Sequence, residues 1–221
     1  MGKDKLKRFE EIKTFPNVLE PPVMETYTNK GKWHQEIFKN DKPIVLELGC
    51  GKGEYSVGLA KLYPDKNFVG IDIKGNRIYI GAKECLEKGI DNVMFLRTRI
   101  DFINNFFDAN EVDEIWLTFS DPQPKKARKR LTSSLFINRY RKFLKKGGKI
   151  HLKTDSHILF EFTEEDIKNN NYTCHALTWD LYGNFFESLS EEEQRIFTIR
   201  THYEKLFASK GSVIKYCCFS L

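Results

Sequence analysis

From Pro43 onward, the sequence alternates between short runs of β-branched and aromatic residues and longer segments with helical periodicity. The short runs predict strands over 44–47, 68–73, 93–96, 114–119, 149–154, 173–181 and 213–221. The segments between them predict helices over 54–62, 76–88, 135–144, 158–168 and 191–209. This alternation favours an α/β fold: a doubly wound, mostly parallel seven-stranded sheet with helices on both faces and an antiparallel edge strand.

The N-terminal residues 1–41 lack this alternation. We expect them to form an extension that is basic at first and then contains Pro16, Pro21 and Pro22, whose fixed φ resists regular structure. Residues 42–221 then form one folded domain, because no repeat, low-complexity tract or composition break divides them.

The composition narrows the class of protein. Five cysteines, an odd number without a C-x-x-C pair, indicate neither a disulfide framework nor a zinc cluster, so we expect no metal site and a reducing, cytoplasmic location. No apolar run approaches the roughly 20 residues that cross a bilayer, so we expect no membrane segment. The net charge of +5 is modest, but lysine and arginine gather between Lys125 and Lys149.

The first predicted strand runs into a glycine-rich turn over residues 47–53, with Gly49, Gly51 and Gly53 spaced as G-x-G-x-G. Glu54 occupies the third glycine position of the dinucleotide fingerprint, and no G-K-[ST] follows, so the turn matches neither that fingerprint nor a P-loop. The Glu47 carboxylate would repel a pyrophosphate but would suit the cationic sulfonium and ammonium of S-adenosylmethionine. The turn therefore favours that cofactor over NAD.

Asp72 ends the second predicted strand, about 20 residues after the turn. An acid at this place can accept hydrogen bonds from ribose hydroxyls, because ligands of such sheets bind beyond the carboxyl ends of the strands. The alternative is an ordinary strand–turn–helix with an exposed acid. A nicotinamide-dependent dehydrogenase is a further alternative, weakened by the incomplete fingerprint.

A basic loop follows the fourth predicted strand. Asp121 lies between that strand and two prolines, and five of the six residues from Lys125 to Arg130 are cationic. Such a run beside a cofactor turn suits the phosphates of a nucleic acid. By itself it would equally fit a solvated surface loop.

Two further polar constellations lie near the same edge. Lys153-Thr154-Asp155 ends the fifth predicted strand, where it could contact a ligand or cap the next helix. Thr201-His202-Tyr203-Glu204 lies in a charged helical stretch, where Tyr203 and Glu204, taken alone, would be helix-surface residues.

Taken together, these residues make the chain resemble the bacterial tRNA (guanine-N7)-methyltransferases, Rossmann-like class I enzymes that use S-adenosylmethionine. The resemblance covers nearly the whole chain and implies that the target is a guanosine in the variable loop of tRNA. It implies that Asp121 is catalytic and that the cofactor is bound by Glu47, Gly49, Gly51, Asp72, Arg99 and Asp121. It places the substrate contacts at Lys125, Asp155, Thr201, His202, Tyr203 and Glu204.

The chain departs from the family pattern at two positions. Gln123 stands where many members have tryptophan, and Arg99 stands where an acid is common, with Asp101 close by. Guanine N7 carries a free lone pair, so the reaction needs positioning rather than a strong base. Two alternatives stay open: a methyltransferase of the same fold that acts on a protein or small molecule, and a non-catalytic RNA-binding module. The oligomeric state also stays open.

Overall fold

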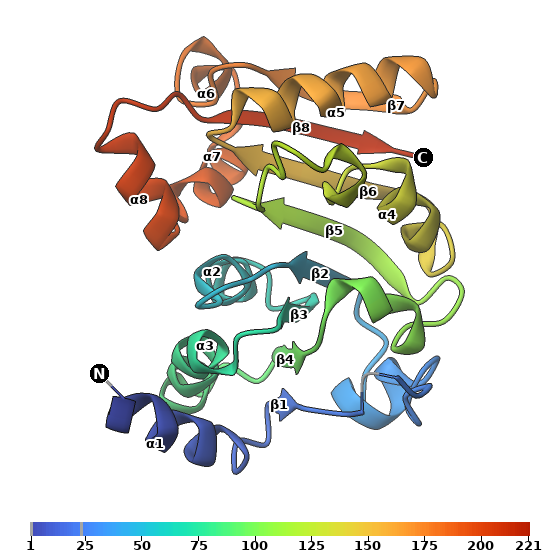
Figure 1. Cartoon of the computed structure of the whole chain (residues 1–221), viewed down its shortest axis with the longest axis vertical. Helices are drawn as coiled ribbons and strands as arrows, with labels where there is room; N and C mark the ends of the chain where they lie inside the picture. The colour runs from blue at the N-terminus through green and yellow to red at the C-terminus, as the bar shows by residue number, and fades with distance from the viewer. Residues whose placement is uncertain (1, 23) are drawn as a thin grey trace.

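The computed structural model describes residues 2–22 and 24–221. Its centre is a sheet of eight strands in the order β1-β4-β3-β2-β5-β6-β8-β7 (Figure 1). The strands are β1 Val18–Leu19, β2 Ile44–Leu48, β3 Asn67–Asp72, β4 Val93–Arg97, β5 Val112–Thr118, β6 Leu144–Thr154, β7 Thr173–Thr178 and β8 Lys215–Ser220. The α-helices are α1 Gly2–Ile12, α2 Glu54–Leu62, α3 Gly75–Lys88, α4 Ser134–Tyr140, α5 His157–Asn169, α6 Asn184–Glu187, α7 Glu191–Thr198 and α8 His202–Ala208. A π-helical segment covers Trp33–Phe38, and 3-10 turns cover Ile100–Asn105 and Ala127–Lys129.

The strand directions confirm a mostly parallel sheet. β2 pairs in parallel with β3 on one side and with β5 on the other, and β6 is parallel to β5. β8 is antiparallel to both β6 and β7, so the antiparallel strand lies one place in from the edge, which β7 forms. The order of strands reverses between β2 and β5, which makes the carboxyl end of β2 the topological switch point.

Helices cover both faces of the sheet because successive strand residues point to opposite sides. Leu46 of β2 packs in a core with Phe136 of α4 and Phe160 of α5. Its neighbour Val45 packs in a second core, with Tyr55 of α2. Within the described ranges, none of the helices has the length and apolar character needed to span a membrane.

Part of the predicted extension belongs to the sheet. Val18 and Leu19 pair with Phe95 and Leu96 of β4, which raises the predicted seven strands to eight. Asn17 supports this pairing because its side-chain amide donates to the Ala82 carbonyl at 3.0 Å. The expectation that the proline-containing part of the extension resists regular structure was therefore wrong for β1. β1 forms because it pairs with β4, although the prolines around it disfavour a strand.

The helix predicted over 135–144 was wrong in its second half. The helix α4 ends at Tyr140, and Leu144 already pairs with Val112 as the first residue of β6. Pairing with β5 thus overrides the helical pattern of the local sequence.

The helix predicted over 191–209 is two helices. Ile199 is extended and Thr201 caps α8, its hydroxyl accepting from the Glu204 N–H at 3.1 Å. Thr201-x-x-Glu204 has the Ser/Thr-x-x-Glu spacing of a capping box, a signal that could have revealed the break. Ile199 leaves the helical path to pack against α2 at Gly58, where an added Cβ would lie 2.6 Å from the Ile199 side chain.

We predict that Gly81→Ala destabilises the protein. Gly81 of α3 lies so close to the glycine-rich turn that an added Cβ would stand 2.5 Å from the Lys52 carbonyl oxygen and 2.9 Å from the Phe95 ring. Overpacking of this kind costs about 1–3 kcal/mol, more than the helix-propensity gain of about 1 kcal/mol. Urea unfolding should show a lower midpoint for Gly81→Ala than for the wild type or for Glu87→Ala, a surface change on the same helix. A midpoint equal to that of the wild type would contradict this packing.

Candidate active site

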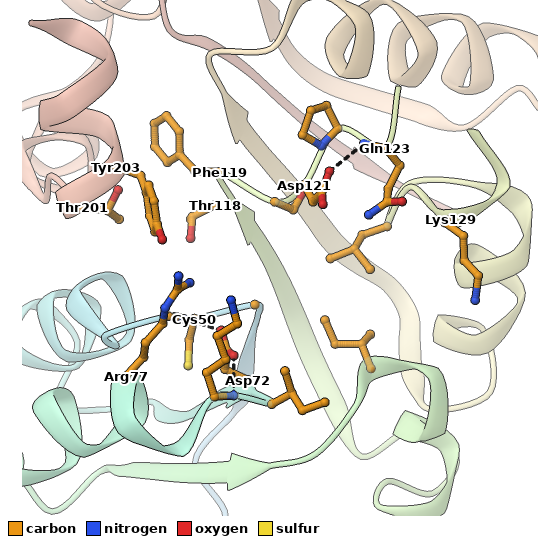
Figure 2. Close-up of a pocket in the computed structure, with 18 of the residues that line it drawn as sticks. Cys50, Asp72, Arg77, Thr118, Phe119, Asp121, Gln123, Lys129, Thr201 and Tyr203 are labelled. Atoms are coloured by element: carbon orange, nitrogen blue, oxygen red, sulfur yellow. Dashed lines mark hydrogen bonds between the residues drawn. The ribbon is translucent and has the colours of Figure 1, made fainter. Parts of the chain in front are cut away.

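A cavity of about 840 Å³ opens at the carboxyl ends of the parallel strands, at the topological switch point. Its walls come from the turn after β2, the ends of β3, β4 and β5, and the start of α8 (Figure 2). Its lining includes eight of the residues that the sequence singled out: Gly49, Gly51, Asp72, Arg99, Asp121, Asp155, Thr201 and Tyr203. The cavity is large enough for a nucleoside cofactor together with part of an acceptor.

The glycine-rich turn forms an open cradle. Gly49 and Gly51 adopt φ of 84° and 57°, which side chains rarely tolerate, and a Cβ at either residue would project into empty space. Ligand atoms can therefore approach this backbone closely. Asp72 orders the turn, since one of its oxygens accepts from the Gly51 N–H at 3.0 Å and the other from the Lys74 N–H at 2.8 Å. Each oxygen keeps a further lone pair for a ligand hydroxyl.

Glu47 lies behind this turn rather than on the cavity wall. Its carboxylate accepts hydrogen bonds from the Ser56 N–H at 2.9 Å, the Ser56 hydroxyl at 2.5 Å and the Thr118 hydroxyl at 2.5 Å. The side chain is 3% exposed, and burial raises the pKa of its carboxyl to about 7 against these hydrogen bonds. In this structure Glu47 joins β2 to α2 and β5, and its direct contact with a cofactor remains a prediction.

The backbone around Asp121 is strained on both sides. Phe119 and Gln123, neither of them glycine, have φ of 51° and 46°. The Asp121 carboxylate holds the corner by accepting from the Gln123 N–H at 2.9 Å. Such strain persists only where the surrounding structure enforces it and is concentrated at functional sites. The corner directs Asp121 toward the cavity, facing Asp72 across it (Figure 2).

Asp155 also lines the cavity. Its side chain has no hydrogen-bond or ion-pair partner among the described residues. Its backbone carbonyl accepts from the Lys215 ammonium at 2.9 Å, which fixes the loop after β6. Ser156 caps α5, so Lys153-Thr154-Asp155 does not provide the cap that was the alternative interpretation of this motif.

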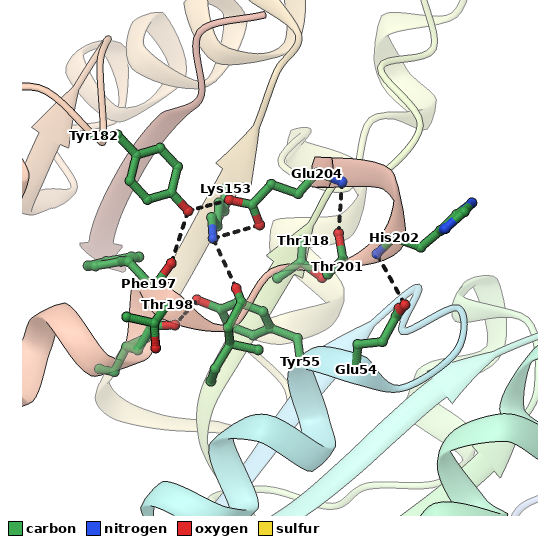
Figure 3. A network of polar contacts seen from close by, with 12 residues as sticks. Glu54, Tyr55, Thr118, Lys153, Tyr182, Phe197, Thr198, Thr201, His202 and Glu204 are labelled. Carbon is green, nitrogen blue, oxygen red and sulfur yellow. Dashed lines mark hydrogen bonds and ion pairs between the residues drawn. The ribbon is translucent and has the colours of Figure 1, made fainter. Parts of the chain in front are cut away.

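Behind the cavity, a buried ion pair anchors α8 (Figure 3). The Lys153 ammonium lies 2.9 Å from the Glu204 carboxylate, and both side chains are fully buried. Glu204 also accepts from the Tyr182 hydroxyl. Desolvation lowers the pKa of Lys153 to about 8, although the Glu204 charge opposes it. The expectation that Glu204, taken alone, would lie on the helix surface was therefore wrong, and its contact with a substrate remains a prediction.

Helix α8 also contacts the start of α2, directly after the glycine-rich turn. The His202 N–H donates to the Glu54 carboxylate at 3.1 Å, and Tyr203 and Phe207 of α8 line the cavity. In the sequence, Glu54 only excludes a dinucleotide fingerprint, and no motif marks Lys153 as a partner of Glu204. No local pattern reveals either contact, because each joins residues more than 50 positions apart.

The sequence left open whether Arg99 or Asp101 corresponds to the acid that is common in the family after this strand. Both residues line the cavity. They form an ion pair at 3.0 Å, and Lys129 approaches the same carboxylate at 3.3 Å. Burial acts to raise the pKa of Asp101, but the hydrogen bonds and charges of Arg99 and Lys129 outweigh it and lower the pKa. Either group is thus placed to contact a ligand near the end of β4.

The basic loop divides into two parts. Lys125, Lys126 and Arg128 are exposed, and no ion pair holds them within the described chain. Arg130, by contrast, is 6% exposed and donates to the Pro122 carbonyl at 2.9 Å, so it braces the Asp121 corner instead of facing solvent. Lys129 pairs with Asp101 as described above. Of the predicted substrate positions, Lys125, His202 and Glu204 do not line the cavity.

The described part of the chain contains no group of three or more His, Cys, Asp or Glu side chains that could hold a metal ion. All five thiols are free, and only Cys174 is exposed.

The chain shares its fold with solved methyltransferase structures. Two solved structures share it at a TM-score of 0.62: the 16S rRNA methyltransferase KamB, 14% identical, with 85% of this chain and 91% of that one covered, and an antibiotic-related methyltransferase, 15% identical, with 90% and 97% covered.

Sequence comparison identifies the family to which the chain belongs. The model of a family described as putative methyltransferase matches residues 41–217. The tRNA (guanine-N(7)-)-methyltransferase of Bacteroides thetaiotaomicron is 52% identical, with all of this chain and 87% of the relative covered. The protein of the same name from Christiangramia forsetii is 45% identical, with 100% and 99% covered. The chain belongs to the tRNA (guanine-N7)-methyltransferase family.

We predict a pH-dependent stability that originates at Glu47. The folded-state pKa of Glu47, about 7, exceeds the ordinary 4.5. The protonated side chain therefore contributes favourably to the free energy of unfolding. This contribution is complete below pH 4.5 and is lost as the pH rises through 7. The loss is at most about 3 kcal/mol, since one pKa unit corresponds to about 1.4 kcal/mol. The free energy of unfolding of Glu47→Gln should therefore rise relative to the wild type between pH 4.5 and 7.

Glu87→Gln, an exposed control on α3, should keep a constant difference from the wild type over this pH range. A constant difference for Glu47→Gln as well would show that Glu47 is ionised throughout.

Proposed function

We propose that this protein transfers a methyl group from S-adenosylmethionine to N7 of a guanosine in the variable loop of tRNA. The observation that carries the proposal is the meeting, in one cavity, of an open glycine cradle with three carboxylates, Asp72, Asp121 and Asp155. The relatives named tRNA (guanine-N(7)-)-methyltransferase support the choice of substrate. The free thiols and the substrate class support a cytoplasmic location.

The cavity lining fits the cofactor. Backbone at Gly49 and Gly51 allows close approach, and Asp72 can accept hydrogen bonds from ribose hydroxyls. S-adenosylmethionine, when bound, supplies a methyl group on a positively charged sulfur. The buried Glu47 adds negative charge behind the turn whenever it is ionised.

The acceptor requires alignment rather than a base. Guanine N7 carries a lone pair and no proton, so the residues need only hold the base in line with the methyl group. Asp121 can orient guanine by accepting from its N1–H and exocyclic amino group, and Asp155 offers a second acceptor. Methylation places positive charge on the imidazole portion of the base. Nearby carboxylates stabilise that charge as it develops.

The aromatic side of the cavity suits a base. Phe119 stacks on Phe207 with centroids 6.4 Å apart, and Phe207 stacks on Tyr203 at 6.3 Å. These rings supply apolar surface on which a base can stack, whereas Gln123, where many family members have tryptophan, adds no ring to the cavity lining. A methyltransferase of the same fold acting on a protein or small molecule would have no need of the exposed cations of the basic loop. Nucleoside analysis of tRNA treated with protein and cofactor, searching for 7-methylguanosine, tests the proposal.

We predict that Asp121→Ala retains cofactor binding and loses methyl transfer. Removal of a group that stabilises developing charge lowers the rate by about 100-fold or more. Calorimetric titration should give the cofactor a nearly unchanged Kd, whereas single-turnover transfer to tRNA should slow. Asp65→Ala, an exposed acid just before β3 at the opposite end of the sheet, serves as the control. Wild-type turnover by Asp121→Ala would exclude Asp121 from catalysis.

We predict that Lys125→Glu, Lys126→Glu and Arg128→Glu together weaken tRNA binding. For each phosphate that the variant no longer binds, the slope of log K against log salt should fall in magnitude by about 0.7–0.9. Filter binding over a range of KCl concentrations measures this slope. Lys142→Glu, Lys146→Glu and Lys149→Glu make the same charge change at the opposite end of the sheet, where we expect no effect. If both triple variants behaved alike, the loop would lie outside the interface.

A further inference from the structure

Three cations line the cavity on the side away from the basic loop. Lys52 belongs to the glycine-rich turn, Lys74 directly precedes α3, and Arg77 lies in the first turn of that helix. Figure 2 shows Arg77 and Lys129 on opposite sides of the cavity. No sequence motif assigns a role to any of these three cations.

These cations differ from the lysines within α2 and α3. Lys61 and Lys88 each lie 2.8 Å from the Glu84 carboxylate, and Lys83 lies 3.4 Å from that of Glu11. In the described ranges, no carboxylate oxygen lies within 4.0 Å of the Lys52, Lys74 or Arg77 nitrogens. The lysines of α2 and α3 that lie away from the cavity are therefore paired with carboxylates, whereas the three cations that line the cavity are not.

Arg77 is the most constrained of the three. Its guanidinium lies 5.5 Å from the centroid of the Tyr203 ring, which places it across the cavity mouth from α3 toward α8. Its N–H donors make no hydrogen bond within the described chain. A cation stacked on an aromatic ring keeps its edge donors free for an anion.

The cavity thus has an acidic interior between two cationic rims. Asp72, Asp121 and Asp155 line its interior. Lys126 of the basic loop lines it on one side, next to the exposed Lys125 and Arg128, and the three cations described here line it on the other. An enzyme that acts on a base within folded RNA must extract that nucleotide. Its flanking phosphates then lie on both sides of the opening, where cations on only one rim would leave half of the backbone unbound.

We propose that Lys52, Lys74 and Arg77 form a second phosphate-binding rim, which holds the tRNA backbone on the side of the cavity opposite the basic loop. This inference rests on the proposed function for the identity of the RNA. The anion is a phosphodiester, and the alternative anion in reach is the carboxylate of the cofactor.

The test uses the triple variant Lys52→Gln, Lys74→Gln and Arg77→Gln in the full-length protein. Its tRNA affinity, measured against KCl concentration, should have a slope lower by about 0.7–0.9 for each phosphate that is no longer bound. Its Kd for S-adenosylmethionine should equal that of the wild type. Combined with the basic-loop changes, the decrease in slope should be additive, because the two rims hold different phosphates.

The matched control is Lys61→Gln, Lys83→Gln and Lys88→Gln, which removes the same charge from lysines of α2 and α3. Its slope should equal that of the wild type. The proposal is overturned if the rim variant keeps the wild-type slope, or if it loses cofactor affinity at an unchanged slope, which would assign these cations to the cofactor carboxylate. Nucleoside analysis of the wild type judges the methylation proposal separately, because the slope is measured without any transfer.

Discussion

The parallel direction of β2, β3 and β5 is the constraint on which the rest of the site depends. Because these strands run the same way, their carboxyl ends meet at one edge, and the reversal of strand order beside β2 opens a crevice there. The glycine cradle, Asp72 and the Asp121 corner follow three different strands, yet each lines this crevice. An antiparallel neighbour would have carried its loop to the opposite edge.

Charge is arranged in layers around this crevice. Carboxylates inside it suit a positively charged methyl donor and the positive charge that guanine gains on methylation. Cations at its margins suit the phosphates of the substrate. The positive and negative side chains need to lie apart. A cation close to N7 would oppose the reaction, and a carboxylate at the margin would repel RNA. Asp101, held by Arg99 and Lys129, lies where the two layers meet.

Helix α8 is positioned by buried polar contacts. Lys153 and Glu204 form an ion pair that no water reaches, and loss of either partner alone would leave an isolated buried charge. Through this pair and the Glu54 contact, the aromatic wall of Tyr203 and Phe207 is tied to the same strand ends that form the cradle. The aromatic wall and the glycine cradle are therefore held at the same edge of the sheet by shared contacts.

The sequence by itself determined the sheet class, the glycine turn, the position of Asp72 after the second strand and the Asp121 corner, because periodicity and turn chemistry are local properties of the chain. Only the tertiary structure decided that Val18–Leu19 join the sheet, that the last long helix breaks at Thr201, and that Glu204 is buried with Lys153. Only the tertiary structure also showed that Arg130 is buried and donates to the Pro122 carbonyl, whereas the neighbouring loop cations are exposed. These outcomes depend on contacts between residues far apart in sequence, whose burial and partners no local pattern encodes.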